Sequence, residues 1–186
     1  MRVIAGISRG VPLKVVRAAG LRPTSDLVRG AIFDMVGPYF SAEMRALDLY
    51  AGTGALGIEA LSRGAGWADF VEQQPRCCAG LEENLARTGL KERGKVHCMP
   101  VRQALPLLNG PYRLVLADPP YADAVASQVL SGLAEHALVD PDSIIVLEHA
   151  YRVPVLETHQ GLQLVKQRRH GDTMISVFVM EGVRVG

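Results

Sequence analysis

Short apolar runs alternate with helix-like segments from about residue 45 onward, and this alternation restricts the possible fold more than any other feature. Runs such as 46–49 and 114–117 have the length of buried strands. Strands that alternate with helices form a mostly parallel sheet. The sequence therefore predicts an α/β fold with a seven-stranded sheet. Strands are expected near 45–51, 67–73, 95–100, 112–118, 143–149, 162–169 and 173–180, and helices near 55–63, 75–88, 101–108 and 123–136.

Both ends of the chain add to this pattern. Gly171-Asp172 separates the last two expected strands, which predicts a hairpin and therefore an antiparallel last strand. Residues 2–17 alternate loosely and predict a small β-hairpin, with Pro12 restricting its second half to an edge strand. A helix is expected to follow, capped by Thr24 or Ser25.

Charge is distributed unevenly along the chain. The first 30 residues hold six basic side chains against Asp26, a net charge of +5, so the remainder carries −4 of the total of +1. A basic segment on an acidic body is typical of nucleic-acid binding, although a solvated hairpin without a partner explains it equally well. The basic residues are Arg2, Arg9, Lys14, Arg17, Arg22 and Arg29.

Several classes of protein do not fit the sequence. No apolar run approaches the roughly 18–20 residues that span a bilayer, and the first residues lack the apolar core of a secretory signal. Three cysteines, Cys77, Cys78 and Cys98, show no Cys-x-x-Cys spacing. We therefore expect reduced thiols in a cytoplasmic protein, with no metal site and no membrane contact.

A glycine-rich turn, Gly52-Thr53-Gly54-Ala55-Leu56-Gly57, follows the expected strand 45–51. Glycines at this spacing let the backbone approach a ligand closely, and Glu72 at the next strand's end can accept hydrogen bonds from ribose hydroxyls. NAD and S-adenosylmethionine both satisfy this pattern, and a plain strand-to-helix turn explains the glycines alone. Asp48 adds a carboxylate that suits the cationic amino-acid tail of S-adenosylmethionine.

The tetrapeptide Asp118-Pro119-Pro120-Tyr121 ends the run 114–117 and favours amine methylation. The lone pair of an exocyclic base amine is delocalised into the ring, so the amine is a poor nucleophile. The Asp118 carboxylate and the Pro119 carbonyl can accept both N–H groups and free that lone pair. The two prolines are rigid and carry no competing N–H, and Tyr121 offers a flat face for the base.

The chain resembles the RsmD family of bacterial methyltransferases nearly from end to end. The similar segments are Arg2–Gly6 with Arg9-Gly10, Leu21-Arg22-Pro23-Thr24 with Asp26, Val28-Arg29 and Phe33, then Leu47–Leu61, Asn84-Leu85, Asp118–Tyr121 and Gly171-Asp172-Thr173. The Arg-Pro-Thr segment is the most discriminating, because many amino-methyltransferases share Asp-Pro-Pro-aromatic stretches.

The resemblance implies a Rossmann-like class I methyltransferase that transfers methyl from S-adenosylmethionine to N2 of a guanine in 16S ribosomal RNA. Residues 1–40 would form an RNA-facing extension and residues 41–186 the methyltransferase domain. A monomer acting within a small-subunit assembly particle is expected. The expected catalytic residues are Asp118, Pro119, Pro120 and Tyr121; cofactor contacts come from Asp48, Ala51, Gly52, Gly54, Glu72, Gln73 and Gln103; RNA contacts come from Arg2, Arg9, Lys14, Arg22 and Arg29.

The chain departs from the family pattern at a few positions. Gly30 stands where the family usually has a glutamate that could orient Arg29, and Val101-Arg102-Gln103 stands where an acid near the adenine is expected. Tyr121 replaces a common phenylalanine. An amino-methyltransferase for another RNA, DNA or protein, an NAD-binding enzyme and a non-catalytic RNA-binding assembly factor remain as alternatives.

Two polar clusters near the C-terminus leave their roles open. Glu148-His149 could orient a target base or simply end a strand, and the latter is favoured for His149. The basic residues of 166–170 suit RNA contact and a solvated edge strand equally well.

Overall fold

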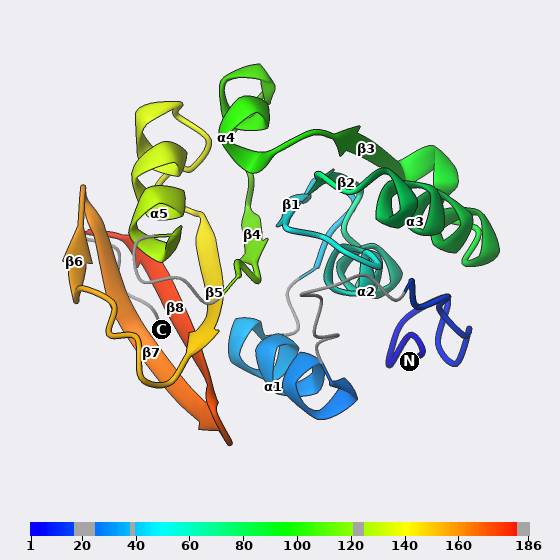
Figure 1. Cartoon of the computed structure of the whole chain (residues 1–186), viewed down its shortest axis with the longest axis horizontal. Coiled ribbons are helices and arrows are strands. Elements are labelled where there is room, and N and C mark those ends of the chain that lie inside the picture. The colour runs from blue at the N-terminus through cyan, green and yellow to red at the C-terminus, as the bar shows by residue number, and fades with distance from the viewer. Residues whose placement is uncertain (17–24, 38–39, 121–124, 182–186) are drawn as a thin grey trace.

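The computed structural model describes residues 1–16, 25–37, 40–120 and 125–181, and these form one mixed eight-stranded sheet flanked by helices (Figure 1). The strand order is β3-β2-β1-β4-β5-β8-β7-β6, in which β1 to β5 are parallel and β8 is antiparallel to both of its neighbours. The strands are β1 (Arg45–Leu49), β2 (Trp67–Glu72), β3 (Gly94–Cys98), β4 (Leu114–Ala117), β5 (Ile144–Ala150), β6 (Thr158–His159), β7 (Leu162–His170) and β8 (Thr173–Met180). The helices are α1 (Asp26–Val36), α2 (Ala55–Arg63), α3 (Pro75–Arg87), α4 (Val101–Ala104) and α5 (Val125–Glu135), with 3₁₀ turns η1 (Lys91–Arg93) and η2 (Leu105–Leu107).

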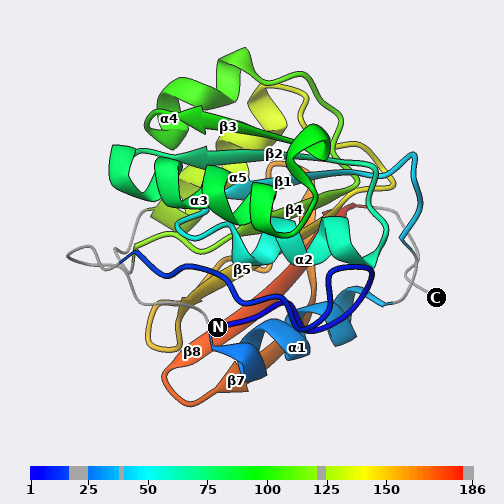
Figure 2. The same cartoon turned by 90° about the vertical axis from the view of Figure 1, so that its right-hand side faces the viewer.

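The sheet separates two apolar layers. In Figure 2, α1, α2 and α3 lie in front of the sheet and α5 lies behind it. Successive side chains of β4 point to opposite faces, so Leu116 packs with the α1–α3 layer and Val115 with the α4–α5 layer. Burial on both faces explains why the parallel strands are nearly continuous apolar runs.

Most of the expected elements are confirmed, including the β7–β8 hairpin and the Ser25 cap, whose Oγ accepts from Val28 N at 3.2 Å. Two details differ. The sheet has an eighth strand, β6, whose two residues are too few to leave a pattern in the sequence. The helix expected over 101–108 ends at Ala104 as an α-helix and continues as η2, because Pro106 has no N–H to donate.

The N-terminal hairpin forms, but with a single antiparallel bridge between Arg2 and Pro12. Backbone bonds from Val3 N to Val11 O (3.0 Å) and from Gly10 N to Val3 O (2.9 Å) close it. The hairpin is not a free arm: Val3 and Leu13 are buried in the same apolar layer as α2. The two-domain division at residue 40 stays a prediction.

Candidate active site

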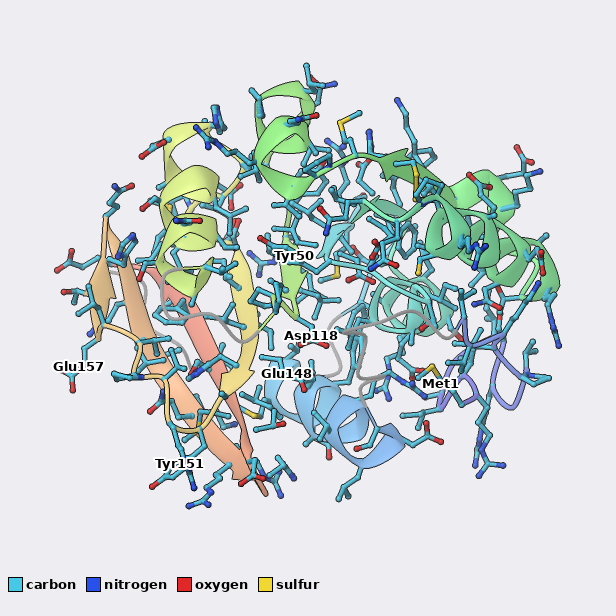
Figure 3. The ribbon with its side chains drawn as sticks, viewed as in Figure 1. Met1, Tyr50, Asp118, Glu148, Tyr151 and Glu157 are labelled. Atoms are coloured by element: carbon cyan, nitrogen blue, oxygen red, sulfur yellow. A yellow bond between two sulfur atoms is a disulfide. The ribbon has the colours of Figure 1, made fainter. Side chains whose placement is uncertain are left out.

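The carboxyl ends of β1 and β4 bring the two sequence motifs together. These strands are adjacent and parallel, with Leu49 opposite Ala117, so Tyr50 and Asp118 leave the sheet side by side. The Asp118 N–H donates to Leu49 O at 3.4 Å. Figure 3 shows Tyr50, Asp118 and Glu148 near one another in the middle of the molecule. The predicted meeting of the glycine-rich turn and Asp118 at one edge is confirmed.

The glycine-rich turn requires glycine for two different reasons. Gly52 and Gly54 have positive φ values of 54° and 74°, which side chains rarely tolerate. At Gly57 an added Cβ would lie 2.3 Å from the Phe70 ring, so glycine is needed there to pack α2 onto β2. The turn therefore combines a backbone conformation that favours glycine at its tip with close packing of the helix that follows it.

Glu72, which was predicted to accept hydrogen bonds from a ribose, is itself hydrogen-bonded to the glycine-rich turn. Its Oε2 accepts from Gly52 N at 2.9 Å and its Oε1 from Gln74 N at 2.7 Å. Each carboxylate oxygen has two lone pairs, so both oxygens keep capacity for a hydroxyl donor. The ribose contact of Glu72 stays a prediction.

Asp48 lies beneath the turn and is 1% exposed. Its Oδ2 accepts from Gly57 N at 2.8 Å, which supplies the N-terminal cap that Gly54 cannot provide for α2. Burial raises the pKa of Asp48 well above its ordinary value; the Gly57 N–H opposes this shift, and the charges of Asp118 and Glu72 add to it. The site therefore concentrates carboxylates that a cation would stabilise.

Asn84, which lies in the segment similar to the RsmD family, connects three parts of the site. Its Nδ2 donates to Thr53 O and to Lys14 O, both at 3.0 Å, and its Oδ1 accepts from Lys14 N at 2.7 Å. A fully buried asparagine on α3 thus fixes the glycine-rich turn and the N-terminal hairpin together.

A buried ion pair, missed by the sequence reasoning, anchors the N-terminus to α2. Glu59 accepts from Ile4 N at 2.8 Å, from Ala5 N at 3.0 Å and from Arg63 Nε at 2.8 Å. Arg29 Nε lies 4.0 Å from Glu59 Oε2. The sequence did contain a signal for this contact: Glu59 lies on the buried face of the helix expected over 55–63, where a carboxylate needs a partner.

Arg29 is a correction to the predicted RNA contacts. Its side chain is 0% exposed, pairs with Asp26 Oδ1 at 3.0 Å and donates to Arg2 O. This burial leaves no guanidinium surface for RNA, so Arg29 is a structural residue. Gly30 next to it has open space where a Cβ would lie, so packing does not require that glycine.

The other predicted RNA residues differ in availability. Arg2 and Arg9 are exposed. Lys14 is exposed but pairs with Glu83 Oε2 at 2.7 Å. Arg22 lies outside the described residues.

The remaining predicted site residues surround the same edge of the sheet. Ala51 and Pro119 are buried, while Gln73, Gln103 and Pro120 are exposed. Tyr121 lies outside the described residues.

The cysteines contradict the expectation of free thiols. Cys78 at the start of α3 and Cys98 at the end of β3 form a disulfide with a Cα–Cα distance of 5.9 Å. They lie 20 residues apart, but the β2–β3 register places Cys98 opposite Glu72, and Cys78 is in the next helix. Cys77 is a buried free thiol, and burial followed by the Glu72 charge raises its pKa.

His149 is a satisfied strand residue, as favoured from the sequence. Its Nε2 lies 2.8 Å from Ser176 Oγ and its Nδ1 lies 3.0 Å from Ala150 O. Burial lowers its pKa, although the backbone groups of Ala150 and Val153 oppose the shift. Among the described residues, no three His, Cys, Asp or Glu side chains are grouped to hold a metal ion, and no helix is long and apolar enough to cross a membrane.

Comparison with known proteins agrees with this geometry. A family model described as conserved hypothetical protein 95 matches residues 1–179. The chain belongs to this family. It is the RsmD family that the sequence motifs resemble. The Haemophilus influenzae ribosomal RNA small subunit methyltransferase D is 33% identical over 92% of this chain and 89% of its own length. A Bacillus subtilis protein named as a candidate rRNA methyltransferase, YlbH, is 35% identical over 98% of this chain and all of its own length.

Solved structures identify the fold as Rossmann-like and of the methyltransferase type. A candidate methyltransferase from Escherichia coli, yhhF, matches with a TM-score of 0.86 and 28% identity over 97% of this chain and 98% of its own. A Salinibacter ruber RNA methyltransferase in complex with S-adenosyl-L-homocysteine matches with a TM-score of 0.67 over 88% of this chain and 97% of its own; at 13% identity this likeness concerns the fold alone.

Proposed function

We propose that this RsmD-family protein transfers a methyl group from S-adenosylmethionine to the N2 amine of a guanine in 16S ribosomal RNA. The observation that carries the proposal is the β1–β4 register, which sets Asp118 beside Tyr50, two residues before the glycine-rich turn. The names of the relatives support an RNA substrate. The proposal extends to a substrate held in a small-subunit assembly particle and to a monomeric enzyme.

The residues at this edge fit S-adenosylmethionine. Gly52 and Gly54 hold the turn in a positive-φ conformation without side chains of their own, and Glu72 keeps lone pairs for ribose hydroxyls. Asp48, Glu72 and Asp118 together form a negative field for a ligand that carries a sulfonium and an ammonium. Ala51, Gln73 and Gln103 complete the proposed contacts. When bound, the cofactor supplies an electrophilic methyl group.

The chain itself prepares the amine. The Asp118 carboxylate and the Pro119 carbonyl accept the two N–H groups of the guanine, which turns the nitrogen toward tetrahedral geometry. Pro119 and Pro120 keep the turn rigid, and Tyr121 stacks on a base flipped out of its helix. Positioning is the main catalytic device and supplies up to roughly 7–11 kcal/mol in favourable cases.

RNA would reach this edge along the exposed basic residues of the N-terminal hairpin, Arg2 and Arg9. Contacts with phosphates would fix the orientation of the RNA without reading its sequence. Because the hairpin is bonded to α2 through Glu59, any such contact is rigidly connected to the helix that begins at the glycine-rich turn.

The test is a single-turnover methyl-transfer assay on small ribosomal subunits at saturating cofactor and RNA. Asp118→Ala should lower the rate about a hundredfold or more, since contacts realised mainly in the transition state contribute about 2.7–4 kcal/mol. Asp118→Asn should be less damaging, because its carbonyl can accept one N–H. Asp172→Ala, an exposed aspartate in the β7–β8 turn, is the matched control and should keep the wild-type rate.

A folded Asp118→Ala protein with a near wild-type rate would remove the tetrapeptide from the mechanism. Nucleoside analysis of the product tests the guanine N2 position separately. Methyl transfer to DNA or protein instead of RNA would assign the same chemistry to another substrate.

A further inference from the structure

A cleft of about 680 Å³ lies between α4 and α5 and reaches Tyr50. Its volume falls in the range of small-ligand sites and suits a single nucleotide. Its lining mixes apolar residues with polar side chains, which include Arg102 on α4 and Ser127 and Gln128 on α5. It lies on the side of the sheet opposite α2, the helix that begins at the glycine-rich turn.

This cleft adjoins the proposed catalytic tetrapeptide through Tyr50. Tyr50 follows Leu49 as Asp118 follows Ala117, and those two residues are register partners in adjacent parallel strands. Figure 3 shows Tyr50 and Asp118 at the same central edge. A nucleotide strand with its target base at Asp118 therefore has the cleft within reach of its next residue.

The backbone of Tyr50 is held in an unusual conformation. Its φ of 60° lies in the left-handed region, which is sterically costly for a residue with a Cβ. The half-buried Tyr50 ring contributes to the lining of the cleft. An aromatic ring in such a place suits stacking against a nucleobase.

The polar lining has unused hydrogen-bonding capacity. Arg102 is exposed, and within the described residues its guanidinium makes no hydrogen bond or ion pair; the same holds for the side chains of Ser127 and Gln128. A guanidinium suits a phosphate, and an amide can both donate to and accept from a base edge. Glu135 also lines the cleft, so the lining holds a single arginine and a single carboxylate, a set that suits one nucleotide better than a length of backbone.

We infer that the α4–α5 cleft binds a nucleotide next to the target guanosine, with Arg102 on its phosphate and Tyr50 and Gln128 against its base. The inference rests on the proposed function and adds a specificity site to it. It also gives a role to Arg102, which stands where the family pattern led us to expect an acid near the adenine.

The test compares Arg102→Ala and Tyr50→Asn with Arg87→Ala, an exposed arginine on α3 outside the cleft. Asparagine tolerates positive φ, so Tyr50→Asn removes the ring without breaking the turn. Affinity for small-subunit RNA should fall roughly tenfold in both cleft variants. Arg102→Ala should also lower the salt slope by about one counterion, whereas Tyr50→Asn should leave the slope unchanged.

Binding of S-adenosylhomocysteine, measured by calorimetry, should be unchanged in Arg102→Ala. Weaker cofactor binding in Arg102→Ala would assign the cleft to the cofactor and overturn the inference. Unchanged RNA affinity in both cleft variants would also overturn it, and so would an equal loss of RNA affinity in Arg87→Ala. A wild-type protein that methylates no RNA would overturn the proposed function itself. The RNA affinities of the variants test the cleft separately, because they do not depend on methyl transfer.

Discussion

Asp48 and Asp69 are buried carboxylates on the neighbouring strands β1 and β2, and their surroundings are opposite. Asp48 accepts from one backbone N–H and faces the charges of Asp118 and Glu72. Burial raises the pKa of Asp69 too, but hydrogen bonds from His97, Tyr112 and Trp67 and the charge of His97 outweigh it, so its pKa is lowered.

The difference separates a carboxylate with a single backbone donor from one at the centre of a side-chain hydrogen-bond network. Asp69 accepts from His97 Nε2 at 2.8 Å, Tyr112 OH at 2.9 Å, Trp67 Nε1 at 3.0 Å and Arg45 Nη2 at 3.2 Å. These donors occupy both carboxylate oxygens and connect β1, β2, β3 and the segment just before β4. At the carboxyl edge, Asp48 has one backbone donor and lies near two further carboxylates, Asp118 and Glu72, whose charges add to the rise in its pKa.

The largest expected effect comes from breaking the complete network. Asp69→Asn should lower the free energy of unfolding by roughly 3–5 kcal/mol at neutral pH, because it leaves buried donors without a charged acceptor. Urea denaturation measures this change, with Asp48→Asn as the paired variant, for which no comparable loss is expected. Equal stability losses in the two variants would erase the distinction between them.

Removing the ribose acceptor should produce the next largest effect. Glu72→Ala should weaken S-adenosylmethionine binding by about 1.5–3 kcal/mol, the contribution of a hydrogen bond to a charged group. Calorimetry on the folded variant is the measurement, and Glu82→Ala, an exposed glutamate on α3, is the control. Wild-type affinity in Glu72→Ala would exclude Glu72 from the cofactor site.

The pH dependence of stability should show the smallest effect and opposite signs for the two carboxylates. The pKa of Asp48 is raised in the folded state. Its contribution to the free energy of unfolding is therefore present below the ordinary aspartate pKa and is lost as pH rises through its pKa in the folded protein. Asp48→Asn should therefore gain stability relative to wild type as pH rises through that window.

For Asp69 the sign reverses. Its lowered pKa gives stability that is present above the ordinary aspartate pKa and is lost as pH falls through the folded value. Unfolding free energies measured from acid to neutral pH in wild type and both Asp→Asn variants check both signs. A gain for Asp48→Asn as pH falls would contradict the assigned shift.

The strands, turns and helix starts that depend on neighbouring residues could be predicted from the sequence. Apolar runs located β1 and β4, the glycine spacing located the turn between β1 and α2, and Ser25 located the start of α1. Features that depend on register could not be predicted. The Cys78–Cys98 disulfide requires knowing that β3 lies beside β2, and the burial of Arg29 requires knowing that Glu59 faces α1.

The anchoring of the N-terminal hairpin has a consequence for the order in which the chain can fold as it is synthesised. The first residues made must wait for partners made much later: Ile4 N needs Glu59, Lys14 N needs Asn84, and Ser8 Oγ donates to Thr88 O at 2.8 Å. A nascent chain must therefore carry its beginning unanchored until α3 has emerged. The glycine-rich turn, which Asn84 holds through Thr53, becomes fixed at the same stage of synthesis.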